Sequence, residues 1–215
     1  MENDVLDSLA SQAVDRALAR RRTTYADEVR RLVDAGFELI RQSGRLEPRV
    51  SEIVRVAGLS NQAFYRHFRS KDELLVTVLD EGIRQLAGYL QHRMARVDSP
   101  EQKIREWIAG LCEQALNPGA AEATRPFALS RSRLSERFPQ EVQRSETRMT
   151  AILRDAIEAA TEAGEFSDTS PDRDAAMVYG LAMGWMQQRL AQPEPPSRED
   201  AEHLIEFALA GLRGR

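Results

Sequence analysis

Apolar side chains recur at intervals of three and four residues along most of the chain, which is the period of a helix with one buried face. The first clear stripe predicts a helix over about residues 25–42 and contains Val29, Leu32, Val33, Gly36, Phe37 and Ile40. Strict alternation of apolar and polar residues is not sustained in the sequence, so we expect no β-strand. The pattern therefore predicts an all-α protein.

Two short helices are expected next, over about residues 48–57 and 61–67. They are separated by Gly58-Leu59-Ser60. Glycine readily adopts the left-handed conformation that a sharp turn requires, and a serine side chain can cap the helix that follows. This order of helix, tight turn and short helix predicts a helix-turn-helix.

Helix-capping signals divide the rest of the chain. Ser70 and Glu73 have the spacing of a capping box, and Ser99 and Ser170 each precede a proline suited to a first helical position. Residues 1–22 form a polar leader, either a frayed helix or a mobile arm. About nine helices result, the later ones over about residues 71–96, 100–116, 120–138 with a break at Pro126, 139–163, 171–191 and after Ser197.

The charge along the chain is uneven. The 215 residues carry a formal net charge of −4, yet residues 20–71 contain twelve Lys or Arg and six acidic residues. Residues 72–215 contain seventeen basic and twenty-four acidic residues. A basic segment around a helix-turn-helix favours a polyanionic partner, although an arginine-rich solvated surface would give the same counts.

The helix expected over residues 61–67 carries the candidate recognition residues. A recognition helix presents its N-terminal residues to base edges, where Asn and Gln can bond adenine. Phe64 and Phe68 share a face and should point inward, so Tyr65 should point outward among basic residues that suit phosphate. The candidate DNA-binding residues are Arg49, Ser60, Asn61, Gln62, Ala63, Tyr65, Arg66, His67 and Lys71.

This segment resembles the DNA-binding domain of the TetR family of repressors. The matching positions are Ile53, Ala57-Gly58, Ser60, Tyr65, Phe68 and Lys71-Asp72-Glu73-Leu74-Leu75, and residues 32–39 resemble the first helix of the family. The chain departs from the family at Arg49, Val54 and Ile40, where Thr, Ala and an aromatic residue are usual. The resemblance implies a ligand-released repressor that binds a near-palindromic operator as a dimer. It also implies a DNA-binding domain over residues 23–71 and an effector and dimerisation domain over residues 72–215.

An effector cavity within the later helices is a further implication of the resemblance. Aromatic and Met side chains often line such cavities, although at helical spacing they are more often core residues. Arg125, Arg131 and Arg133 could meet an anionic ligand, but a solvated surface is the favoured interpretation. The identity of the effector does not follow from the sequence, which only weakly favours a hydrophobic molecule. The candidate lining residues are Tyr89, His92, Trp107, Leu111, Cys112, Phe127, Met149, Met183 and Trp185.

The resemblance also implies a homodimer through the last two helices. Gly180 and Gly184 lie four residues apart on one face and would allow close helix packing. The alternative is that these faces pack within the monomer. The candidate interface residues are Gly180, Gly184, Leu204, Ile205, Ala208, Leu209 and Leu212.

Other classes of protein lack support in the sequence. It contains no glycine-rich phosphate loop, metal-ligand pattern or catalytic constellation, so we expect no cofactor, no metal and no enzyme. One cysteine excludes an internal disulfide, and no apolar run is long enough for a membrane span. A cytoplasmic location is the default expectation. The alternative function is a helical ligand- or partner-binding protein with a vestigial DNA-binding head.

Overall fold

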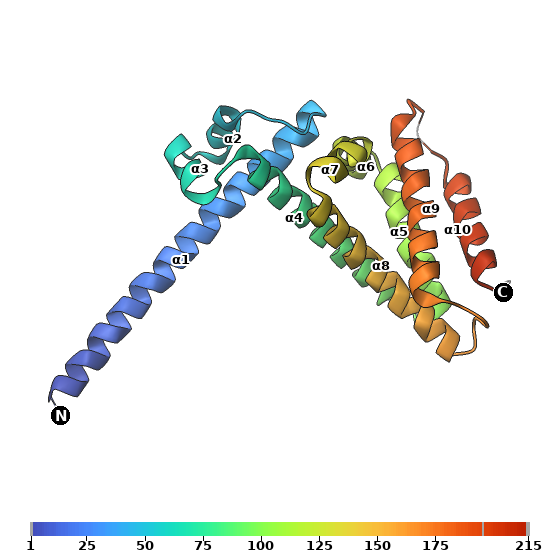
Figure 1. The fold of residues 1–215 in the computed structure, drawn as a ribbon, viewed down its shortest axis with the longest axis horizontal. Coiled ribbons are helices and arrows are strands. Elements are labelled where there is room, and N and C mark those ends of the chain that lie inside the picture. The colour runs from blue at the N-terminus through green and yellow to red at the C-terminus, as the bar shows by residue number, and fades with distance from the viewer. Residues whose placement is uncertain (1, 195, 214–215) are drawn as a thin grey trace. The chain divides into compact units, whose positions relative to one another are not determined.

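The computed structural model describes residues 2–194 and 196–213, and for residues 2–10, 13, 17 and 20 it describes the backbone alone. All regular secondary structure in these residues is helical, which confirms the predicted all-α class (Figure 1). None of these helices is long and apolar enough to span a bilayer. The ten helices of the described residues are α1 (Glu2–Ser43), α2 (Val50–Ala57), α3 (Asn61–His67), α4 (Lys71–Met94), α5 (Pro100–Leu116), α6 (Pro118–Leu129), α7 (Arg131–Arg137), α8 (Pro139–Glu162), α9 (Pro171–Ala191) and α10 (Arg198–Arg213).

Two helices differ from the sequence-based expectation. The backbone of the polar leader continues directly into the first core helix, since α1 runs without interruption for 42 residues. No glycine or proline precedes Gly36, and alanine and arginine favour helix. The break expected at Pro126 lies instead at Ser130, whose φ of −104° and ψ of 13° end α6. Pro126 lies inside α6, and α7 makes ten helices in the described residues where nine were expected.

The chain forms two compact units. Unit 1 comprises residues 1–39 and 47–78, and unit 2 comprises residues 40–46 and 79–215. α1 and α4 each contribute residues to both units. In unit 1, Leu32, Ile53, Phe64 and Leu74 come from α1, α2, α3 and α4 and are at most 2% exposed.

The turn between α2 and α3 has the geometry that its sequence predicts. Gly58 adopts the left-handed conformation at φ 62°, and the Leu59 N–H donates to the carbonyl of Val54 at 2.9 Å. The Ser60 hydroxyl accepts from the Ala63 N–H at 3.1 Å and caps α3. Each hydrogen bond satisfies a helix-end group that would otherwise lack a partner.

Unit 2 is a helical bundle organised around α5, which packs against α6, α8, α9 and α10 (Figure 1). Ile104, Trp107, Ile108 and Leu111 of α5 are fully buried. They join one continuous apolar core with residues of α4, α8, α9 and α10. The regular apolar spacing of α5 is therefore explained by burial on several sides.

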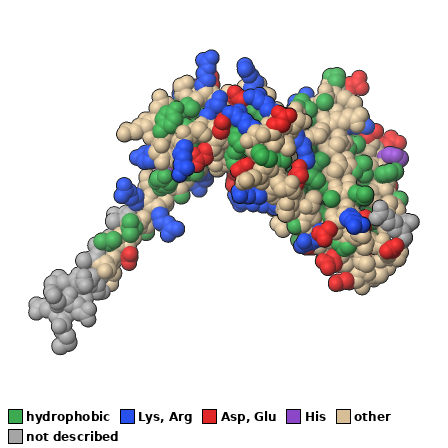
Figure 2. Space-filling view, viewed as in Figure 1, with side chains coloured by type: hydrophobic (Ala, Val, Ile, Leu, Met, Phe, Trp, Pro, Cys, Tyr) green, Lys and Arg blue, Asp and Glu red, His purple; other side chains and the backbone are tan. Residues whose placement is uncertain are grey.

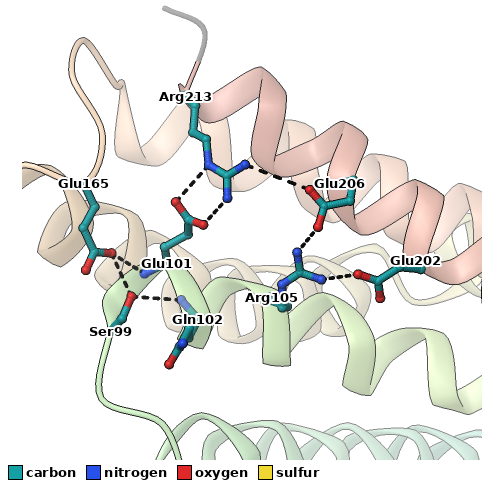
Figure 3. Close-up of polar contacts among 8 residues, drawn as sticks. All are labelled: Ser99, Glu101, Gln102, Arg105, Glu165, Glu202, Glu206 and Arg213. Atoms are coloured by element: carbon teal, nitrogen blue, oxygen red, sulfur yellow. Dashed lines mark hydrogen bonds and ion pairs between the residues drawn. The ribbon is translucent and has the colours of Figure 1, made fainter.

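Ion pairs hold α10 against α5 (Figure 3). Arg105 pairs with Glu202 and Glu206, and Arg213 pairs with Glu101 and lies 4.0 Å from Glu206. The hydrogen bond from Arg213 lowers the pKa of the Glu101 carboxyl. Isolated surface pairs stabilise little, but here several charges form one network that joins the two helices.

Gly58→Ala should lower the free energy of unfolding by about 2 kcal/mol, because it adds a side chain at positive φ and crowds a neighbour. A Cβ at Gly58 would lie 2.8 Å from the Arg31 guanidinium, which donates to the carbonyls of Ala57 and Gly58. The matched control is Gly44→Ala, since Gly44 has a φ of 66° and no atom within 4 Å of such a Cβ. Urea unfolding should show a control loss of about 1 kcal/mol. Equal losses would contradict a role for the Arg31 contact.

Candidate nucleic-acid interface and cavity

α3 divides cleanly into a buried face and an exposed face. Phe64 and Ala63 are buried in unit 1, as is Phe68 just after the helix. Asn61, Gln62 and Arg66 are exposed, and Tyr65 is 62% exposed. The arrangement presents two amides, a phenol and a guanidinium on a short, firmly seated helix.

Two further candidates, Arg49 and Lys71, lie at helix starts. Arg49 is exposed before α2, and its N–H donates to the Glu52 carboxylate at 2.9 Å, so a glutamate supplies a cap contact where the family's threonine is missing. Lys71 opens α4 and lies 3.6 Å from the Glu47 carboxylate, with its side chain 35% exposed. The capping box predicted at residues 70–73 is confirmed on its serine side, since Ser70 accepts from the Glu73 N–H at 3.2 Å.

His67 has a different environment from the other candidates. Its side chain is fully buried, and Nε2 lies 2.5 Å from the Glu28 carboxylate. The ring packs edge-on against Tyr25, whose hydroxyl donates to the Arg66 carbonyl at 3.2 Å. The imidazole therefore joins α3 to α1 and has no surface for a phosphate. Ala63 is also buried, and its N–H already donates to the Ser60 hydroxyl. Its side chain therefore has no surface for DNA.

Sequence reasoning did not select Arg21 and Arg22 for the site. Both are exposed on α1, and Arg21 lies four residues before Tyr25 on the same helix face. Because Tyr25 contacts the end of α3, Arg21 and Arg22 lie about one helical turn along α1 from that contact. Figure 2 shows Lys and Arg side chains on this part of unit 1 and along the neighbouring stretch of α1. The run of three arginines at residues 20–22 was the available signal.

Unit 2 contains a cavity of about 100 Å³ lined by residues of α4, α6, α7, α8 and α9. Its walls are mostly apolar, with one polar cluster formed by Arg131, Glu146 and Tyr179. Arg131 pairs with Glu146 and lies 3.4 Å from the Tyr179 hydroxyl. A larger depression of about 570 Å³ is lined partly by charged residues, among them the paired Arg41 and Glu122.

Three of the nine predicted cavity residues line this cavity, namely Phe127, Met149 and Met183. The other six lie elsewhere. Trp107, Leu111 and Cys112 are core residues of α5, and burial raises the pKa of the Cys112 thiol to about 12. Tyr89 and His92 are exposed on α4, and Trp185 is half-buried beneath Arg189. Sequence periodicity marks a residue as inward-facing, but core and cavity wall share that period.

The predicted interface residues also separate into two groups. Gly180 and Gly184 are exposed on α9, with open space where a Cβ would be. In contrast, Leu204, Ile205, Ala208, Leu209 and Leu212 are buried in the core of unit 2. The exposed apolar residues on α9 and α10 are instead Met177, Leu181 and Phe207, at 64%, 38% and 65% exposure.

Glu28→Gln should destabilise the protein at neutral pH, with the difference shrinking in acid. The hydrogen bond with His67, followed by the charge of Arg66, lowers the pKa of Glu28 from its ordinary value of 4.5. A lowered folded-state pKa stabilises above the unfolded value and loses this contribution as the pH falls through the folded value. Urea unfolding of both proteins between about pH 7 and pH 3 measures the difference. A difference that stays constant over this range would contradict the linkage.

Comparisons with known proteins support two family matches. Residues 32–78 match the model of bacterial regulatory proteins of the tetR family, and residues 105–214 match the BetI-type transcriptional repressor C-terminal model. The HTH-type transcriptional regulator BetI of Brucella anthropi is 31% identical over 80 residues, which is 37% of this chain and 41% of the BetI chain. The chain thus spans less than half the length of this curated relative.

Solved structures agree in fold. Escherichia coli NemR in its reduced form has a TM-score of 0.67 at 21% identity, covering 87% of this chain and 97% of NemR. FadR of Bacillus subtilis in complex with stearoyl-CoA has a TM-score of 0.66 at 18% identity, covering 84% and 97%. The family matches place the chain among transcription regulators and not among enzymes. With its helix-turn-helix and its helical second unit, the chain belongs to the TetR family of transcriptional regulators, with a BetI-type C-terminal domain.

Proposed function

We propose that this protein is a repressor that binds a near-palindromic operator as a homodimer and is released by a small molecule. The observation that carries the proposal is the exposed face of α3, which has Asn61 and Gln62 at its N-terminal end. Phe64 and Phe68 on the opposite face are buried and hold the helix in place. A helix so presented can enter a major groove. The match to a BetI-type transcriptional repressor supports repression as the sign of regulation.

The contacts to DNA would be of two kinds. Asn61 and Gln62 can bond base edges and so read sequence. Arg49, Ser60 and Tyr65 would contact phosphates, which position the protein without reading sequence. The remaining phosphate candidates are Arg66, Lys71 and, from the structure, Arg21 and Arg22.

A dimer interface would form from the exposed faces of α9 and α10. Met177, Leu181 and Phe207 are large apolar side chains in contact with water, and Gly180 and Gly184 permit close approach of a second helix. A two-fold axis would bring the same faces of two copies together. Two recognition helices about 34 Å apart could then occupy successive major grooves.

Effector release would act through α4. Leu79, Ile83 and Leu86 of α4 line the cavity, and Leu74 and Val78 of the same helix pack against Gly36 in unit 1. A ligand shifts DNA binding only if it binds the two states unequally, and displacement of α4 is a physical route to that inequality. FadR of Bacillus subtilis, with the same fold, is solved with stearoyl-CoA.

Selection of bound sequences from a random duplex pool at near-physiological salt tests the DNA-binding function, and we expect an enriched inverted repeat. On that operator, Gln62→Ala should cost about 1–3 kcal/mol and relax base preference at one position of each half-site. Tyr65→Phe should instead weaken binding to all sequences similarly, by about 1 kcal/mol. Salt-sensitive binding with no enrichment would favour a ligand- or partner-binding protein with a vestigial DNA-binding head. Unchanged base preference in Gln62→Ala would refute its assignment.

Phe207→Glu should convert the dimer into the 24.3 kDa monomer and weaken operator binding, because a charge would be buried at the two-fold interface. Sedimentation equilibrium measures the mass. The control is Leu129→Glu, since Leu129 is 51% exposed on α6 and belongs to neither helix of the proposed interface. A dimer that survives Phe207→Glu, or one lost equally in the control, would contradict this interface.

A further inference from the structure

The cavity of unit 2 limits the size of any ligand. Its volume is about 100 Å³, and ten of its fifteen lining residues are apolar, among them Phe127, Met149 and Met183. An apolar protein cavity of about 150 Å³ holds benzene, and drug-sized ligands need about 300 Å³ or more. The space is therefore smaller than the cavity that holds benzene, and it fits at most one small ring of about six heavy atoms.

Most polar groups on the cavity wall already have partners. The Thr124 hydroxyl donates to the Gln114 side chain at 3.2 Å, and the Ser145 hydroxyl donates to the Glu141 carbonyl at 3.0 Å. The Tyr179 hydroxyl accepts from Arg131, and within the described part of the chain it donates to no protein acceptor. Burial raises the pKa of Tyr179, so its proton is retained at neutral pH. The wall thus offers one hydroxyl proton to a ligand.

The charges at the cavity are balanced. Arg131 and Glu146 pair with each other, and both also line an adjoining polar depression of about 520 Å³ with Ser132 and Gln187. The pair therefore separates the polar depression from the apolar cavity. To pair with Arg131, an anionic ligand would have to displace Glu146. To pair with Glu146, a cationic ligand would have to displace Arg131. Either exchange leaves a half-buried charge without its partner.

Arg131 also occupies the cation position of the cavity's tyrosine. Its guanidinium lies over the Tyr179 ring, 5.6 Å from the centroid. A second cation on that face would be repelled by Arg131, because both groups carry a positive charge and would occupy the same site over the ring. The aromatic wall is therefore available to a ligand as an apolar surface.

We infer that the cavity binds an uncharged, single-ring organic molecule whose one accepting oxygen receives the Tyr179 hydroxyl proton. The inference rests on the proposed function, in which this cavity is the effector site. It narrows the effector class by size, by charge and by the position of one hydrogen bond.

The test measures binding of four small probes to the full chain by calorimetry. Cyclopentanone has the accepting oxygen, and benzene has the same number of heavy atoms without it. Butyrate and tetramethylammonium supply an anion and a cation of similar size. We expect cyclopentanone to bind, benzene to bind without the hydrogen bond, and neither ion to compete with them.

Tyr179→Phe isolates the hydrogen bond, because it removes the hydroxyl and keeps the ring. It should weaken cyclopentanone binding about fivefold and leave benzene binding unchanged. The matched control is Tyr89→Phe, since Tyr89 is exposed on α4 and does not line the cavity. Circular dichroism checks that both variants fold.

Three outcomes would overturn the inference: tighter binding of either ion than of cyclopentanone, equal loss of both uncharged probes in Tyr179→Phe, or no binding of any probe to the folded chain. Selection from the duplex pool, run on the same preparation, keeps this result separate from the proposed function. An enriched inverted repeat without probe binding contradicts the ligand class and leaves DNA recognition intact. Probe binding without an enriched repeat supports the ligand class and contradicts the regulator.

Discussion

A helix of seven residues is too short to be stable alone in water, so the proposed DNA contacts all depend on what holds α3 in place. Phe64 and Phe68 seat it on the apolar core of unit 1, and the Gly58 turn with the Ser60 cap sets its start. The buried His67 imidazole bonds Glu28 of α1 and sets its end. Side chains that never reach DNA therefore decide how those that can reach it are presented.

The same physical arrangement occurs in unit 2. α7 is also seven residues long, and Arg131 at its start pairs with Glu146 of the long helix α8. A partly buried ion pair is weak evidence for net stability, but breaking it leaves a poorly solvated charge, so the pair specifies position. Each unit thus fixes a short helix against a long one through a glutamate of the long helix, Glu28 for His67 and Glu146 for Arg131. In unit 1 the result orders a surface, and in unit 2 it closes one side of a cavity.

α4 gives these two arrangements a covalent connection. Its first turns carry Leu74 and Val78 into the core of unit 1, and its later turns carry Leu79, Ile83 and Leu86 to the cavity wall. Gly36 lets α4 approach α1 closely, since a Cβ there would lie 3.2 Å from a Val78 methyl group. Because protein cores are close-packed and transmit strain, a shift of α4 at the cavity would have to repack its contact with α1.

The sequence by itself determined the local features of this protein. The helical period, the Gly58 turn, the Ser60 cap and the family's pattern around Tyr65 and Lys71 each depend on residues close together in the chain. Local steric and hydrogen-bonding preferences act at that range, so they can be inferred from the order of residues. The start of α1 and the break at Ser130 could not be predicted in the same way, because helix ends depend on competing interactions of similar energy.

The tertiary structure alone decided which inward-facing residues line the cavity, which fill the core and which connect helices. Trp107 and Met149 have equally regular helical spacing and are both buried in the core, yet only Met149 lines the cavity. The apolar stripe of α10 is buried on α5, while Phe207 on its other side is exposed. The sequence predicted that His67 contacts phosphate, but its buried side chain instead connects α3 to α1. Periodicity records only that a side chain leaves water, whereas its partner is set by packing between segments that are distant in the sequence.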